Sequence, residues 1–283
     1  MKSIYKILMN MVLVIIVLTA CTDVIEVEVP EAKPKLVVEA SIDWEKGTAG
    51  NQQTILLSTT TPYFAENKFE PVIGASVTLT KNNTNQTITF TDNNDGSYST
   101  TEFTPELDTS YTLEIMNQNE VYTATETMTK GIDITSIYQS KEGGFDDEHL
   151  EVNISFQDPE DETNYYLIKY LEEGDLFPVL EVDNDEFSNG NLKNDFFEKE
   201  DDEDINQQPF VPGDKVFISL YGISKRYYNY MAILIEQSEV GGDPFSAIPT
   251  TLQGNVINNT NPKNNALGYF RLTQVSKATY TFN

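Results

Sequence analysis

The feature that most constrains the fold is an alternation of apolar and polar side chains between residue 36 and about residue 129. The clearest alternating or strand-like stretches are 36–42, 53–58, 75–79, 88–90, 111–115 and 121–125. A period of two is typical of half-buried β-strands, because successive side chains of a strand point to opposite faces. Turn-forming residues separate the stretches. About seven short strands in this span predict an immunoglobulin-like β-sandwich, which we assign to residues 35–130.

The remaining residues, 131–283, have a less regular pattern that predicts a second β-rich domain. Strands are predicted at 150–156, 165–171 and 215–221. One helix is predicted at 225–239, because apolar residues recur there at three- and four-residue steps, Ser224 precedes them as a cap, and two glycines follow. The predicted fold class is therefore mainly β, with a sandwich followed by a β-rich domain that carries one helix.

Residues 181–208 are crowded with Asp, Glu and Asn. Such a composition cannot bury much apolar surface, so we predict a long mobile loop there. Its acids have two interpretations, which are a solvated surface insertion and a loose collector of cations.

Aromatic residues of the predicted helix also have two interpretations. Tyr227 and Tyr230 either pack beneath the helix or form a contact surface for a partner. Phe245, which follows the helix in a Gly-Gly-Asp-Pro-Phe phrase, is a third candidate for partner contact.

The first twenty residues predict export and lipid attachment. Residues 1–10 contain two lysines and no acid, and an apolar run follows at 11–18, which is the order found in secretory signals. The run ends in Leu-Thr-Ala-Cys, which resembles the lipobox of bacterial lipoproteins. We therefore expect residues 1–20 to be a signal peptide and Cys21 to carry the lipid, with an ordinary cleaved signal as the alternative. Cys21 is the only cysteine, and lipidation would remove an otherwise unpaired thiol.

Residues 21–34 are acidic and contain two prolines, so we expect an extended tether. Its acids, Asp23, Glu26 and Glu28 among them, resemble the signals that send lipoproteins to the outer face of the outer membrane in Bacteroidota. A plain solvated spacer is the other interpretation. We expect the protein to be outer-membrane, lipid-anchored and surface-exposed.

Net charge excludes several kinds of partner. Without residues 1–20, the chain holds 16 bases and 45 acids, a net charge of −29. Such a surface repels phosphate backbones and anionic headgroups, so nucleic-acid binding and electrostatic docking to membranes are disfavoured. No second apolar run approaches the roughly 20 residues that cross a bilayer.

Candidate catalytic and metal-binding residues are few, and we expect no enzyme, cofactor or metal. His149 is the only histidine, so it would have to serve any Ser-His or Cys-His arrangement, and Cys21 is assigned to lipid. Paired carboxylates remain open because acids are so numerous. Residues 92–96, Asp-Asn-Asn-Asp-Gly, lack the calcium-loop spacing, and we expect a hairpin turn there whose glycine adopts positive φ.

Several phrases together resemble a known family. They are Leu36–Ala40, Gly74–Val77, Asp95–Tyr98, Tyr111–Leu113, Asn164–Tyr166, Tyr227–Tyr230, Gly242–Phe245, Leu252–Val256 and Leu267–Phe270. In this order they are similar to the Bacteroidota lipoproteins known as domain of unknown function 4249 (DUF4249), over essentially the whole chain after the signal. One departure is Gln253, which stands where a basic residue is expected.

The resemblance implies an outer-membrane lipoprotein encoded beside a TonB-dependent transporter, and hence a role in nutrient capture. It carries over no catalytic residues. The alternative function is a structural or adhesive surface lipoprotein without a transport role.

Overall fold

The structure is a computed structural model, and it describes residues 33–62, 69–202, 207–239 and 252–283. Residues 34–283 form one compact unit. The strands of the first half are β1 (Leu36–Glu45), β2 (Gln53–Thr59), β3 (Glu70–Pro71), β4 (Ser76–Lys81), β5 (Gln86–Asp92), β6 (Ser97–Thr100), β7 (Ser110–Asn117) and β8 (Glu120–Thr127). Those of the second half are β9 (Ile134–Ser140), β10 (Glu151–Gln157), β11 (Tyr165–Glu172), β12 (Val179–Asn184), β13 (Leu192–Glu198), β14 (Lys215–Ile223), β15 (Ile257–Asn258) and β16 (Leu267–Thr281).

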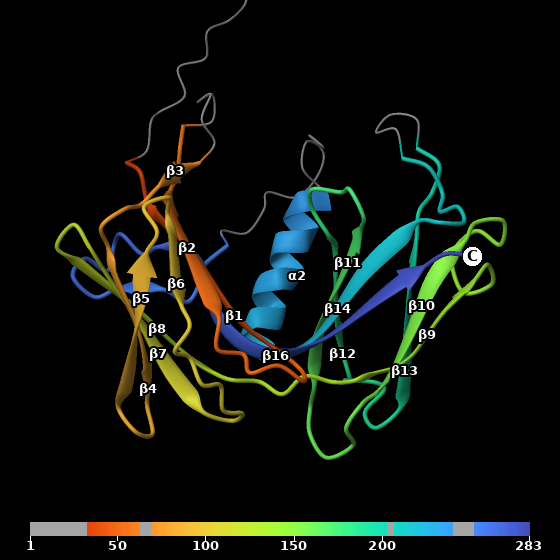
Figure 1. The fold of residues 1–283 in the computed structure, drawn as a ribbon, viewed down its shortest axis with the longest axis horizontal. Helices are drawn as coiled ribbons and strands as arrows, with labels where there is room; N and C mark the ends of the chain where they lie inside the picture. Colours follow the sequence, from red (N-terminus) through yellow and green to blue (C-terminus); the bar gives the residue numbers. More distant parts are fainter. Residues whose placement is uncertain (1–32, 63–68, 203–206, 240–251) are drawn as a thin grey trace, which may run out of the picture. The chain divides into compact units, whose positions relative to one another are not determined.

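The first half forms the predicted sandwich. Hydrogen-bonded strands follow the order β16-β1-β2-β6-β5-β4-β7-β8-β15, and β5 meets β6 at one end through Thr91–Ser99 and Asp92–Tyr98. Figure 1 shows β4, β5, β7 and β8 as a layer beside β1, β2 and β6. Side chains from both layers share one core. The mainly β fold class with an immunoglobulin-like sandwich is therefore confirmed.

Alternation explains how this core forms. Along β7, Tyr111, Leu113 and Ile115 are fully buried, whereas the residues between them are half-buried. Because each strand buries every second residue, a short strand can supply three or four core side chains while its other face meets solvent.

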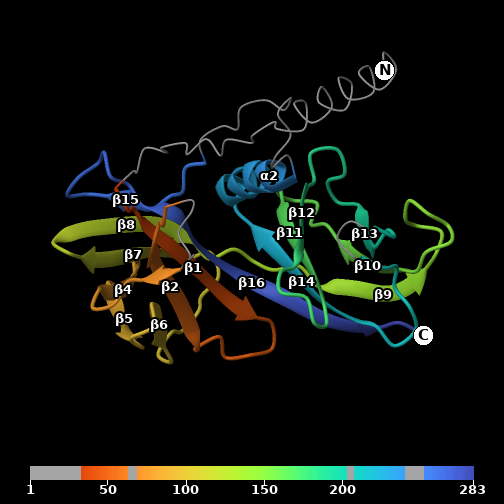
Figure 2. The same ribbon diagram turned by 90° about the horizontal axis from the view of Figure 1, so that it is seen from above.

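The second half continues the same sheet through β16, β14, β11 and β12. β13, β10 and β9 form a separate three-stranded sheet, and its apolar side chains pack against Tyr166, Ile168 and Tyr170 of β11. The helix α2 (Lys225–Glu239) covers the other face, as Figure 2 shows. β11 and β14 are therefore covered on both faces. The helix has the bounds that the sequence predicts.

The long strand β16 belongs to both halves. It pairs in parallel with β1 and antiparallel with β14. Phe270 and Leu272 lie in the core of the sandwich, whereas Phe282, just after the strand, lies in the core of the second half. Core membership therefore does not follow the predicted boundary at residue 130, because the last strand of the chain completes the sandwich.

The prediction of a loop over the whole of 181–208 is wrong, because two strands run through it. β12 reaches Asn184 and β13 spans Leu192–Glu198. The two strands form contacts that order them: Lys193 Nζ of β13 lies 2.7 Å from Asp183 Oδ2 of β12, and the ring of Phe197 stacks on Tyr170 of β11 at 5.0 Å. Composition indicated solvation, but tertiary pairing decides the structure here. Residues 203–206 lie outside the described residues.

Candidate functional site

A polar and aromatic surface lies between α2 and the sheet. Phe270 and Leu272 point into the sandwich core, so Tyr269, Arg271 and Thr273 face the opposite side of β16. This side faces α2. A side chain placed there is enclosed by the sheet below and by the helix above.

Arg271, one of only two arginines in the chain, is the central residue of this surface. Its residue exposure is 4%, and its Nη1 donates to Asp43 Oδ1 at 2.6 Å. The guanidinium also lies over the rings of Tyr221, at 4.9 Å, and Tyr227, at 5.3 Å. Its Nε has no hydrogen-bond acceptor among the described residues. Arg271 thus ties β16 to β1 and α2 while retaining one buried donor.

A second cation lies close to this cluster. Lys169 of β11 lies with its Nζ 5.1 Å from the ring centre of Tyr221. Burial, together with the charge of Arg271, lowers the pKa of Lys169 to about 8, and Asp43 opposes this change. Burial also raises the pKa of Tyr221 to about 12. Two cations therefore share one carboxylate beneath the helix.

The candidate contact residues of α2 take part in this packing. Tyr227 is 8% exposed, and its ring lies 4.9 Å from Tyr269 and 6.0 Å from Tyr230. Tyr230 is half-buried and lies 4.8 Å from Tyr269. Tyr227 therefore belongs to the core beneath α2, and Tyr230 adjoins it with part of its surface open. Phe245 and Cys21 lie outside the described residues.

The start of α2 is capped but electrostatically unusual. Ser224 Oγ accepts a hydrogen bond from the amide of Tyr227 at 3.2 Å, as expected of an N-cap. The first turn contains Lys225 and Arg226 and no acid. Because the helix dipole already places partial positive charge there, two further cations are unfavourable unless an anionic group is near. Glu126 lies 3.8 Å from Arg226, but it also accepts hydrogen bonds from Asn255 and Tyr269.

An open groove with a cavity volume of about 520 Å³ lies beside this helix start. It is lined by the connector before β7, the end of β8 and the connector after it, the turn before β11, and the chain from the end of β14 into α2. Charged side chains in the lining are Asp108, Lys130, Glu162 and Lys225. Tyr165, Ile132 and Ile223 supply apolar surface. The groove therefore combines apolar walls with charges of both signs, as small-molecule sites commonly do.

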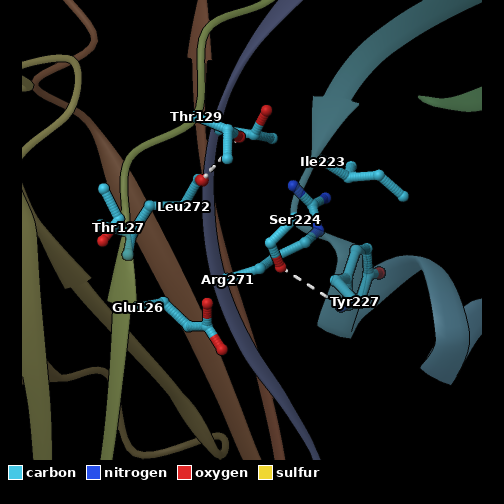
Figure 3. A pocket seen from close by; sticks show the side chains of 9 residues that line it. Glu126, Thr127, Thr129, Ile223, Ser224, Tyr227, Arg271 and Leu272 are labelled. Carbon is cyan, nitrogen blue, oxygen red and sulfur yellow. Dashed lines mark hydrogen bonds between the residues drawn. The ribbon is translucent and has the colours of Figure 1, made fainter. Parts of the chain in front are cut away.

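A smaller hollow, with a cavity volume of about 10 Å³, adjoins the groove. Figure 3 shows Arg271 with its guanidinium beside Ile223 and Ser224, and the hollow shares Thr127, Thr129, Ile223 and Ser224 with the groove. The hollow that contains Arg271 and the groove therefore share one wall.

The floor of the groove depends on close backbone packing. A Cβ at Gly222 would overlap the carbonyl oxygen of Lys130, and one at Gly131 would meet that of Gln274 at 2.5 Å. Thr129 Oγ1 donates to Gly222 O at 2.6 Å. Only glycine permits this crossing of the connector over β14 and β16. Sequence reasoning did not identify these residues, because an isolated glycine gives no sign of which strand it contacts.

Two of the family-like phrases meet beside this site. A Cβ at Gly254 would overlap the carbonyl oxygen of Gly268. Asn255, 2% exposed, accepts from the amide of Phe270 at 2.8 Å and donates to its carbonyl at 2.7 Å. The side chain of Asn255 thus replaces a strand partner for β16. Residues 252–256 and 267–270 therefore act as one structural unit.

His149, the one candidate for nucleophilic catalysis, does not line this groove and lies near buried carboxylates. Its Nδ1 lies 3.5 Å from Glu198 Oε1. Glu198 accepts from the amide of Phe145 at 2.6 Å, and Glu151, fully buried, accepts from the amide of Gly143 at 2.6 Å. These carboxylates organise the turn between β9 and β10. Within the described ranges, no group of three or more His, Cys, Asp or Glu is arranged to hold a metal ion.

Residues 92–96 form the expected hairpin turn between β5 and β6. Gly96 has φ of 87°. Asp92 Oδ1 accepts from the amide of Asn94 at 2.8 Å, and Asp95 Oδ1 accepts from the amide of Ser97 at 2.8 Å. The aspartates therefore stabilise the turn itself.

Comparisons with known proteins assign the family. No curated protein matches the chain. Among solved structures, a DUF4785 family protein from Legionella pneumophila aligns at 12% identity and a TM-score of 0.25. The alignment covers 66% of this chain and 51% of the Legionella protein, so this chain spans about half that protein's length. A two-domain fibronectin type-III segment of chicken tenascin aligns at 13% identity and a TM-score of 0.21, covering 67% and 90%. The model described as domain of unknown function (DUF4249) matches residues 22–279, and the chain therefore belongs to the DUF4249 family.

Proposed function

We propose that this protein is a lipid-anchored outer-membrane lipoprotein that binds a small ligand and works with a TonB-dependent transporter in nutrient capture. The observation that carries the binding role is the groove at the start of α2, where four chain segments bring apolar surface and charges of both signs together. Anchoring is supported by the order of signal, lipobox and tether around Cys21.

Lipid on Cys21 supplies the attachment in this proposal. Each buried methylene contributes about 0.8 kcal/mol, and stable anchoring needs more than one acyl chain, which a lipoprotein cysteine provides. Within the described residues, no helix combines the length and apolar character needed to cross a membrane.

Confinement to the membrane favours a transporter partner. Two proteins held in one thin layer meet at a high effective concentration, so a weak interface can be occupied without additional contacts. A net charge of −29 on residues 21–283 opposes adsorption to anionic headgroups. The body is therefore expected to act through a protein or a small molecule and not through the lipid surface.

Affinity purification tests the partnership. The tagged lipoprotein, extracted in mild detergent, should recover a TonB-dependent transporter, and Phe245→Asp should reduce the recovery. Phe187→Asp is the matched control, because Phe187 is 95% exposed on the turn after β12. Repeated recovery of the lipoprotein alone, with unchanged growth of a deletion strain on every nutrient of the neighbouring transporter, would favour the structural or adhesive alternative.

Protease added to intact cells tests surface display. We expect the wild-type chain to be degraded, and replacement of Asp23, Glu26 and Glu28 by alanine to protect it while the lipid remains. Full protection of the wild-type chain would place it on the periplasmic side and contradict surface capture.

A further inference from the structure

The geometry points to a zwitterionic ligand for the groove at the start of α2: a free amino acid or short peptide whose carboxylate lies at the helix N-terminus and whose ammonium lies by Asp108 or Glu162. This inference rests on the proposed binding role of the same groove.

The carboxylate end is argued from the helix. The amides of Lys225 and Arg226 occupy the first turn, where α-helical geometry leaves N–H groups without intrahelical acceptors, and no acceptor for them is found among the described residues. Both side chains add positive charge to the positive end of the helix dipole, and the turn itself holds no acid. Glu126 lies 3.8 Å from Arg226, whereas Lys225 forms no ion pair with a described residue. A bound carboxylate would accept these N–H groups and offset the charge.

Lys130 and Lys225 strengthen this end of the groove. Both line it, and neither forms an ion pair with a described residue. The Nζ of Lys225 lies 5.9 Å from the ring centre of Tyr165, which also lines the groove. Both lysines are therefore available to pair with a ligand, although the chain contains 45 acids.

Arg271 provides an independent observation. It is 96% buried, its Nε has no acceptor among the described residues, and it lines the hollow that adjoins the groove. A buried donor without a partner is costly to leave unsatisfied. Its position therefore favours a polar, acceptor-bearing group or a water that links it to a ligand.

The ammonium end is argued from the acids of the same lining. Asp108 and Glu162 are exposed into the groove and form no ion pair with a described residue. A purely anionic ligand would meet these acids as well as a strongly acidic body. A zwitterion has no net charge, so the distant acids do not repel it, and screening over about 8 Å at physiological salt limits its interactions to nearby groups.

The apolar lining fits the remainder of such a ligand. Ile132, Tyr165 and Ile223 supply surface between the charged residues. The cavity volume of about 520 Å³ is comparable with sites that hold small molecules. One or two amino-acid side chains could therefore be accommodated between the two charged ends.

Calorimetric titration of the purified full-length protein in mild detergent tests the inference with four forms of alanyl-leucine: free, N-acetylated, C-amidated and blocked at both ends. Leucine itself forms a fifth arm that separates amino acids from peptides. We expect the free dipeptide or leucine to bind at least about tenfold more tightly than any form that has lost a charge. Equal binding of the free and doubly blocked forms, or no binding of any zwitterion at millimolar concentration, would overturn the inference.

Amino-acid substitutions locate where the carboxylate and the ammonium of the ligand bind. Lys225→Gln should weaken binding of the free and N-acetylated forms about tenfold and leave binding of the C-amidated form unchanged. Glu162→Gln together with Asp108→Asn should weaken binding of the free and C-amidated forms about tenfold and leave binding of the N-acetylated form unchanged. Lys215→Gln is the matched control, because Lys215 lies at the opposite end of β14 and pairs with Glu173 at 2.6 Å. If Lys225→Gln, Glu162→Gln and Asp108→Asn all leave binding unchanged, the groove is not the binding site. Recovery of a transporter does not depend on these titrations, so failure of the ligand class leaves the proposed partnership testable.

Discussion

A pair of carboxyl groups joins the two sheets of the second half and makes stability depend on pH. Glu181 lies on β12, at the edge of the large sheet, and Asp195 lies on β13, at the edge of the three-stranded sheet. The hydroxyl of Tyr170, a residue that is 1% exposed, lies near both acids without a hydrogen-bond partner in the described part of the chain. Burial, followed by the charge of Asp195, raises the pKa of Glu181 to about 8, and burial raises the pKa of Asp195.

The sign of the effect follows from proton binding. Glu181 ordinarily titrates near 4.5, so between pH 4.5 and about pH 8 the unfolded chain has lost a proton that the folded chain retains. The free energy of unfolding therefore falls as the pH rises through this window and levels off above it. The full difference of about 3.5 pH units would correspond to about 5 kcal/mol. Since Glu181 is only half-buried, we expect about 2 kcal/mol after allowance for solvent screening.

Glu181→Gln tests this reasoning, because an amide keeps the shape and cannot lose the proton. The variant should unfold at about the same urea concentration as the wild type at pH 5. At pH 8.5 it should be more stable by about 2 kcal/mol, since it avoids burying a charge. Glu186→Gln, at an exposed position just after β12, is the matched control and should show no such change with pH. If the stability difference between Glu181→Gln and wild type is the same at both pH values, the raised pKa of Glu181 does not explain the pH dependence.

Further predictions concern the anchor, the buried ion pair and the groove floor. Cys21→Ser should abolish acylation and leave precursor or soluble protein; if the variant still fractionates with membranes through high-salt and carbonate washing, the lipoprotein assignment is wrong. Arg271→Met should lower the free energy of unfolding by about 3 kcal/mol, because it leaves the Asp43 carboxylate without its partner beneath α2. Asp43→Asn added to that variant should restore part of the loss, and strictly additive losses in denaturant unfolding would contradict the pairing. Gly222→Ala should cost about 2 kcal/mol through overlap with Lys130 O, measured as a lowered Tm, and an unchanged Tm would contradict the close crossing.

Local patterns in the sequence were sufficient for several elements. The alternation of 111–115 predicts β7, because burial of every second residue is a property of one strand and its own face. The helix at 225–239 was equally accessible, since its apolar spacing, cap and following glycines are all local. The family was recognisable from ordered phrases, and its model match over residues 22–279 confirms that reading.

Tertiary structure decided the features that depend on which segments meet. Arg271 and Asp43 are separated by 228 residues, and nothing in either neighbourhood reveals their pairing. β12 and β13 form in a stretch whose composition indicates solvation, because partners such as Lys193 and Tyr170 offset the cost of ordering it. The groove exists because the end of β14, the start of α2 and two connecting segments converge. The strands of the sandwich, the helix and the family could be predicted from the sequence, because each depends on local periodicity or on ordered phrases. The double role of β16 and the candidate site depend on tertiary contacts. Burial patterns indicate which face of an element is covered, but they do not indicate which segment covers it.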